Sequence, residues 1–139
     1  MIVVDGKGLI FGRVASHIAK AVLTGEDVHL INAEEMVLSG DPKMITDKFH
    51  LRRAAKHKGT PEHSPKWPKV PHMLVKRMIR GMLPYKYPRG KAALKKLMVY
   101  TGNPKNLSPG GADFGKPEPR KGSRRIKILD LCRMIGYSG

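Results

Sequence analysis

Short apolar runs and one longer stretch of helical periodicity alternate along the first forty residues. Residues 2–4 form a β-branched run, which predicts a buried strand. Apolar side chains recur at helical spacing in residues 11–24, and Gly25 is placed to end that helix. Residues 28–32 predict a second strand, and residues 36–38 a short third one. A strand, a helix and a strand in so short a stretch are typical of a βαβ unit, so we expect a parallel sheet covered by helices.

The start of a second helix is predicted at Asp41 and Pro42. Asp41 precedes a proline, and this pair favours a helix start because Asp caps the first amides and Pro fits the first turn. We expect a helix over residues 42–56 with Phe49 facing inward. The following residues 57–71 contain four prolines, which predict an extended, irregular but stiff loop.

Two basic helices joined by a stiff bend are predicted in the middle of the chain. In a helix over residues 73–83, Lys76, Arg77 and Arg80 fall on one side and apolar side chains on the other. We expect Pro84 to end this helix, since proline lacks the amide proton and its ring clashes with the preceding turn. A second proline then suits the first turn of a helix over residues 89–97.

The remaining segments complete the predicted fold. Residues 97–101 are expected to be the last strand of the sheet, and residues 129–135 a short terminal helix. Between them, residues 103–123 are rich in Gly and Pro and predict an extended loop without a core of its own. We therefore expect one domain over residues 1–139, of the α/β class, with three α/β/α layers on a small, mostly parallel sheet plus basic helices and extended loops.

Charge is distributed unevenly along the 139 residues, whose formal net charge is +16 at pH 7. Residues 1–47 contain four basic and seven acidic side chains, a net charge of −3. Residues 48–139 contain the other 23 basic side chains and four acidic ones, a net charge of +19. Within them, residues 63–112 include eleven Lys or Arg and no Asp or Glu. Because crowded like charges repel, this pattern predicts a folded base with a basic face that binds a polyanion.

The expected nucleic-acid contacts are basic and aromatic side chains of residues 48–121. Arg suits bidentate contact with phosphate, and aromatic rings can stack on bases. Trp67 has two interpretations that remain open, stacking on a nucleobase or covering the core. No helix-turn-helix, zinc finger or RNP-type strand is recognisable, which favours a shape-recognising, RNA-like partner over sequence-specific DNA. The expected RNA-binding residues are Lys48, Arg52, Arg53, Lys56, Lys58, Lys66, Trp67, Lys69, Lys76, Arg77, Arg80, Tyr85, Lys86, Tyr87, Arg89, Lys91, Lys95, Lys96, Lys116, Arg120 and Lys121.

An enzymatic alternative rests on Gly6, Gly8 and Gly12. They follow a predicted strand and open a predicted helix, which is the context of a dinucleotide-binding fingerprint, and Glu34 and Glu35 lie just past the second strand, near where a ribose-binding acid is expected. The third glycine comes one residue late for that motif. We therefore expect a tight strand-to-helix turn, and keep a nucleotide-dependent enzyme as the alternative.

Other chemistry finds little support in the residue pattern. The six histidines lack zinc-ligand spacing, and the basic stretch has no carboxylate that could hold Mg²⁺. Cys132 is the single cysteine, so it can form no internal disulfide and favours a reducing compartment. No signal-like or membrane-spanning apolar run is present, so we expect an intracellular, soluble chain without membrane contact. These observations predict binding without catalysis, with no cofactor, no metal and no small-molecule substrate.

Several long segments resemble the universal large-subunit ribosomal protein thirteen family. They are residues 4–16 (VDGKGLIFGRVAS), 77–84 (RMIRGMLP), 89–93 (RGKAA) and 97–102 (LMVYTG). Because no long leader precedes residues 1–4, we expect the archaeal and eukaryotic branch of the family rather than the bacterial one. The resemblance implies a structural constituent of the large ribosomal subunit, in the cytoplasm, that binds and organises large-subunit rRNA through the basic helix pair and loops. It also implies neighbouring large-subunit proteins as partners, while a DNA-compacting protein remains the alternative from the residues alone.

Overall fold

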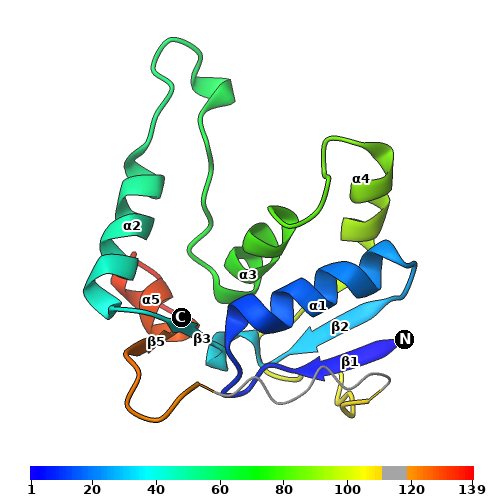
Figure 1. Cartoon of the computed structure of the whole chain (residues 1–139). Coiled ribbons are helices and arrows are strands. Elements are labelled where there is room, and N and C mark those ends of the chain that lie inside the picture. The colour runs from blue at the N-terminus through cyan, green and yellow to red at the C-terminus, as the bar shows by residue number, and fades with distance from the viewer. Residues whose placement is uncertain (111–118) are drawn as a thin grey trace.

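Three parallel strands form the larger sheet of the protein (Figure 1). The computed structural model describes residues 1–110 and 119–139. The strands β1 (Ile2–Asp5), β2 (Val28–Ile31) and β4 (Leu97–Val99) are hydrogen-bonded in the order β1-β2-β4. Helix α1 (Phe11–Leu23) connects β1 to β2. The predicted βαβ unit is therefore confirmed, and so is the expectation that the strand near residues 97–101 is the last of this sheet.

A second sheet joins two segments that are distant in the sequence. Strand β3 (Val37–Ser39) pairs antiparallel with β5 (Arg125–Lys127), with Leu38 opposite Ile126. The expected short third strand is present, but it belongs to this sheet and not to the parallel one. The α/β class with a small, mostly parallel sheet is confirmed.

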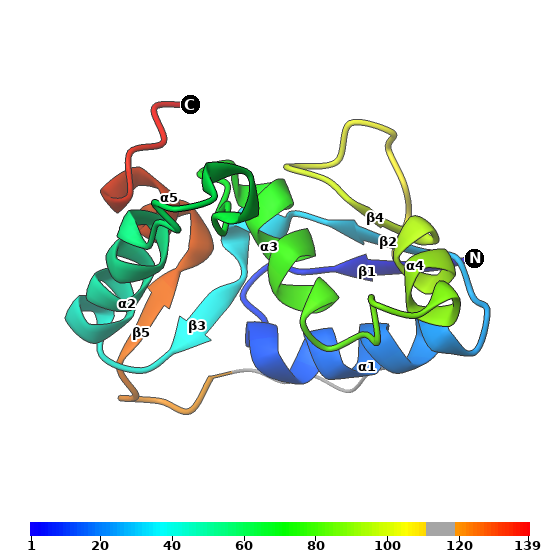
Figure 2. The same cartoon turned by 90° about the horizontal axis from the view of Figure 1, so that it is seen from above.

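The helices divide between the two sheets. Helices α1, α3 (Pro71–Arg80) and α4 (Pro88–Lys95) lie on the same side of the parallel sheet, as the two views show (Figures 1 and 2). Helices α2 (Pro42–Ala54) and α5 (Ile128–Met134) lie beside the two-stranded sheet (Figure 2). Short 3₁₀ turns η1 (Ala33–Glu35) and η2 (Pro61–His63) complete the elements.

Helix α3 corrects one prediction from the sequence. It begins at Pro71, two residues before the expected start, and ends at Arg80 with Gly81 as its C-cap. The amides of Met82 and Leu83 then bond three residues back, to Ile79 and Arg80, so the chain tightens into turns before it reaches Pro84. The prediction that Pro84 ends this helix is therefore wrong.

The core lies between the helices and the sheets. Each of its largest side chains is withdrawn from solvent, which stabilises the fold by roughly 1.5–3 kcal/mol per residue. Trp67 and Met78 are partly buried and pack against this core. Fully buried side chains come from both helices and strands and include Ile18, Leu30, Leu74, Leu97 and Leu131.

Residues 55–70 project from the body as a long arm between α2 and α3 (Figure 1). The hydroxyl of Ser64 accepts a hydrogen bond from the amide of His57 at 2.9 Å, and the amide of His63 donates to the carbonyl of Thr60 at 2.9 Å. These bonds connect the two sides of the arm near its tip. Among the described helices, none is long and apolar enough to span a membrane.

Candidate nucleic-acid interface

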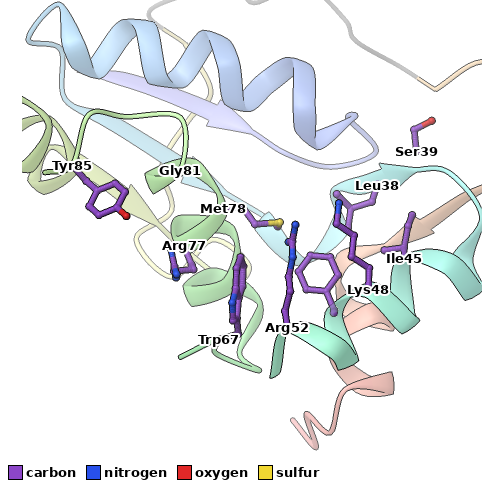
Figure 3. A pocket seen from close by; sticks show the side chains of 11 residues that line it. Leu38, Ser39, Ile45, Lys48, Arg52, Trp67, Arg77, Met78, Gly81 and Tyr85 are labelled. Atoms are coloured by element: carbon purple, nitrogen blue, oxygen red, sulfur yellow. The ribbon is translucent and has the colours of Figure 1, made fainter. Parts of the chain in front are cut away.

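Trp67 lies at the base of the arm and connects it to α2 and α3. The guanidinium carbons of Arg52 and Arg77 are 4.8 Å and 4.6 Å from the centroid of the indole. Figure 3 shows the Trp67 ring between these two side chains. Arg53 donates a hydrogen bond to the carbonyl of Trp67, and Phe49 meets the indole edge-on with the ring centroids 6.0 Å apart. Of the two interpretations of Trp67, the structure places it against the core, with arginines beside its ring.

A cluster of arginines surrounds this tryptophan on the α3 side. Burial lowers the pKa of Arg77, repulsion by Arg80 and Arg52 lowers it further, and Tyr85 acts in the opposite direction. The guanidinium carbon of Arg80 lies 4.7 Å from the centroid of the Tyr85 ring. The Nε of Arg80 is buried without a hydrogen-bond partner among the described atoms. The fold thus holds like charges together at an energetic cost, and an anion bound beside them offsets part of that cost.

The positive charge of this region has no internal counterion. Throughout the described ranges 1–110 and 119–139, no Lys or Arg of residues 48–110 forms an ion pair with a carboxylate. The ion pairs of the described residues lie elsewhere on the fold. The ion pairs join the Met1 amine to Glu26 at 3.8 Å, Lys7 to Glu35 at 4.0 Å and Arg124 to Asp41 at 3.5 Å.

The bend between α3 and α4 depends on Gly90. A Cβ at this position would lie 2.1 Å from the carbonyl oxygen of Pro84 and 2.8 Å from the amide nitrogen of Tyr85. The first turn of α4 therefore packs directly on the backbone of the bend, an approach that only glycine permits. This contact fixes the relative position of the basic side chains on the bend and on α4. Those side chains are exposed and are Lys86, Arg89, Lys91 and Lys95.

Most of the expected RNA-binding residues lie at the surface. Those exposed are Lys48, Lys56, Lys58, Lys66, Lys69, Tyr85, Lys86, Tyr87, Arg89, Lys91, Lys95, Lys96, Arg120 and Lys121. Those partly buried are Arg52, Arg53, Trp67, Lys76, Arg77 and Arg80. Lys116 lies outside the described residues. The arm, α2, α3, the bend and α4 thus supply nearly all of them, and Arg120 and Lys121 come from the separate loop before β5.

Two lysines of the set are held by backbone carbonyls. The amine of Lys76 donates to the carbonyl of Leu97 at 2.9 Å, and burial lowers its pKa. The amine of Lys96 donates to the carbonyl of Gly25 at 2.7 Å. Lys76 therefore ties α3 to β4, and Lys96 ties the end of α4 to the α1–β2 turn. Their ammonium groups are less free to meet a phosphate than those of the other lysines of the set.

A groove between α2 and α3 was not foreseen from the sequence. It has a volume of about 650 Å³, and its apolar wall includes Leu38, Ile45 and Met78 (Figure 3). Lys48 and Arg52 of α2 and Arg77 of α3 also line it. The apolar members come from β3, α2 and α3, so no local sequence pattern could have brought them together.

The glycine-rich turn after β1 is closed by the protein itself. The amide of Gly6 donates a hydrogen bond to the backbone carbonyl of Ile31 at 2.9 Å, and the amide of Gly8 donates one to the backbone carbonyl of Glu35 at 3.2 Å. A pyrophosphate would need such amides to be free. Glu34 is also engaged, because both its carboxylate oxygens lie 3.0 Å from the amide of Gly102. The geometry thus favours the tight strand-to-helix turn over a dinucleotide site.

Metal and thiol chemistry have no candidate centre in the part of the chain that the structure describes. There, no group of three or more His, Cys, Asp or Glu side chains is arranged to hold a metal ion. Cys132 is buried in α5, and burial raises the pKa of its thiol to about 11. A thiol with so high a pKa stays protonated at neutral pH and is a poor nucleophile.

Comparison with known proteins gives a consistent result along almost the whole chain. The family model described as "Ribosomal protein L13" matches residues 1–106. The large ribosomal subunit protein uL13 of Methanocaldococcus jannaschii is 44% identical over 137 residues, which cover 98% of each chain. The proteins of the same name from Methanococcoides burtonii and Aeropyrum pernix are 45% and 41% identical, and the alignments cover 98% and 91% of their lengths. All three organisms are archaea, in line with the expected branch. The chain therefore belongs to the ribosomal protein L13 family.

Proposed function

We propose that this chain is a structural constituent of the large ribosomal subunit in the cytoplasm, and that it binds and organises large-subunit rRNA without catalysing a reaction. It acts as a single domain of residues 1–139, with other large-subunit proteins as neighbours. Family membership supports the ribosomal assignment, because the relatives are named as large-subunit proteins. The RNA contacts are proposed on three parts of the chain. They are the surface formed by α3, the bend at residues 81–87 and α4 (the α3–bend–α4 surface), the arm, and the loop around Arg120.

The observation that carries the rRNA proposal is the uncompensated charge of the α3–bend–α4 surface. Lys86, Arg89, Lys91 and Lys95 are exposed, and none of them forms an ion pair in the described structure. Each such cation that meets a phosphate releases condensed counterions, which supplies affinity at low and moderate salt. Gly90 holds the bend against α4, so the backbone that carries these cations is already in place before RNA binds.

A binding competition tests this function against the DNA alternative. The full-length chain is titrated with a large-subunit rRNA fragment and with duplex DNA of equal phosphate number, at several salt concentrations. We expect tighter binding to the rRNA, because cations spaced on a bent surface can match a folded RNA better than a uniform duplex. Equal or tighter binding to the duplex at every salt concentration would contradict the proposal and favour a DNA-compacting protein.

A further inference from the structure

The groove between α2 and α3 combines two kinds of surface. Its wall of Leu38, Ile45 and Met78 is apolar, and Phe49, only 4% exposed, also lines it. Its volume of about 650 Å³ lies within the roughly 300–1,000 Å³ typical of pockets that bury a small ligand. In Figure 3 the side chains of Leu38, Ile45 and Lys48 lie on one side of Arg52, and those of Trp67, Arg77 and Tyr85 on the other.

Charge on this groove has one sign. Lys48, Arg52 and Arg77 line it, and no carboxylate does. Arg77 is also the guanidinium whose pKa is lowered by burial and by its cationic neighbours, so a bound anion would relieve repulsion at this point. An inorganic phosphate would leave the apolar wall unused, and an apolar peptide would leave the cations unpaired. A ligand with a flat apolar part and an attached anion satisfies both surfaces.

We propose that this groove holds one unpaired nucleotide of the large-subunit rRNA, with its base against the apolar wall and its phosphate among Lys48, Arg52 and Arg77. This inference rests on the proposed function and adds a specific site to it. A nucleotide within a duplex presents only its base edges, so the base must be unstacked to enter. Arginine planes and aromatic rings are the surfaces on which unstacked bases are commonly held.

Trp67 provides a direct reporter of the groove. It is the single tryptophan of the chain, so its indole N–H gives one isolated NMR signal, and the ring lies between Arg52 and Arg77. The full-length chain is titrated with adenosine 5′-monophosphate and, separately, with ribose 5-phosphate, which carries the phosphate but no base. We expect a saturable shift of the Trp67 and Met78 signals with the nucleotide. Ribose 5-phosphate should leave the Met78 methyl unchanged.

Two variants test whether the groove itself is responsible. Ser39 is exposed and lies at the edge of the groove next to Leu38 (Figure 3), so Ser39→Phe introduces a ring at that edge, while Ser16→Phe introduces the same ring at an exposed position of α1. Lys48→Ala removes a lining cation, and Lys43→Ala removes an exposed cation of the same helix that does not line the groove. We expect Ser39→Phe to abolish the nucleotide shifts and Lys48→Ala to weaken them several-fold, with both control variants unchanged.

The same variants separate this inference from the proposed function. Losing one held base is expected to lower rRNA affinity about tenfold in Ser39→Phe, because base contacts of this kind typically contribute that much. Identical shifts with the nucleotide and with ribose 5-phosphate would overturn the base site, and so would nucleotide shifts that persist in Ser39→Phe. If the wild-type chain still binds rRNA in that case, the proposed function stands and only the groove assignment falls.

Discussion

Removing three cations from α4 is predicted to change the salt dependence of rRNA binding by a calculable amount. Arg89, Lys91 and Lys95 are exposed and form no ion pair in the described structure, so Ala at all three positions removes charge with little loss of packing. Each phosphate contact contributes about 0.7 to 0.9 to the slope of log affinity against log salt. If each side chain meets one phosphate, the slope becomes shallower by roughly 2 to 2.7.

This difference is large enough to measure by filter binding. Between 50 and 200 mM salt, the wild-type chain should lose roughly 20- to 40-fold more affinity than the triple variant. The matched control replaces Arg13, Lys20 and Lys43, which are exposed on α1 and α2, and so removes the same net charge from elsewhere. The control should keep a slope near that of the wild type. Equal slopes for the α4 variant and the wild type would refute the assignment of this surface.

Three further predictions concern the fold and its buried groups. Gly90→Ala should lower the free energy of unfolding in urea by about 1–3 kcal/mol, because the added Cβ meets backbone atoms. The control Gly12→Ala, which has open space around it, should raise that free energy by about 0.5–1 kcal/mol. A stabilised Gly90→Ala variant would contradict the packed bend. Because folding raises the Cys132 pKa from 9.0 to about 11, the folded state binds more protons in this range, so stability should fall between pH 9 and 11, and less so in Cys132→Ala. Arg77→Ala should change the fluorescence of Trp67 without RNA, since the guanidinium lies 4.6 Å from the ring centroid, and an unchanged spectrum would argue against that contact.

Local periodicity was sufficient to predict the βαβ unit and the two basic helices. The strand at residues 2–4 and the helix after it were found from β-branched and helical spacing, which act over a few residues. The pairing of β3 with β5 could not be predicted, since Leu38 and Ile126 meet through tertiary packing of segments far apart in sequence. Helix α3 ends before Pro84, because the amides of Met82 and Leu83 bond three residues back in tight turns, and the proline alone does not determine this.

The candidate interface shows the same division between local and long-range information. Spacing placed Lys76 on one helix side with Arg77 and Arg80, but its amine turns to the carbonyl of Leu97, whose position depends on the sheet. Composition gave two interpretations for Trp67, and only its neighbours Arg52 and Arg77 show what surrounds its ring. Charge could be counted along the chain, whereas the groove between α2 and α3 required the fold.

Sedimentation of a cell extract at moderate and high salt tests whether this chain is a built-in component of the large ribosomal subunit. We expect this chain to travel with the large ribosomal subunit and to remain with it through several hundred millimolar salt, a level that screens weak electrostatic binding. Detection of the chain free at the top of the gradient at moderate salt, with intact large subunits below, would contradict a structural role in the subunit.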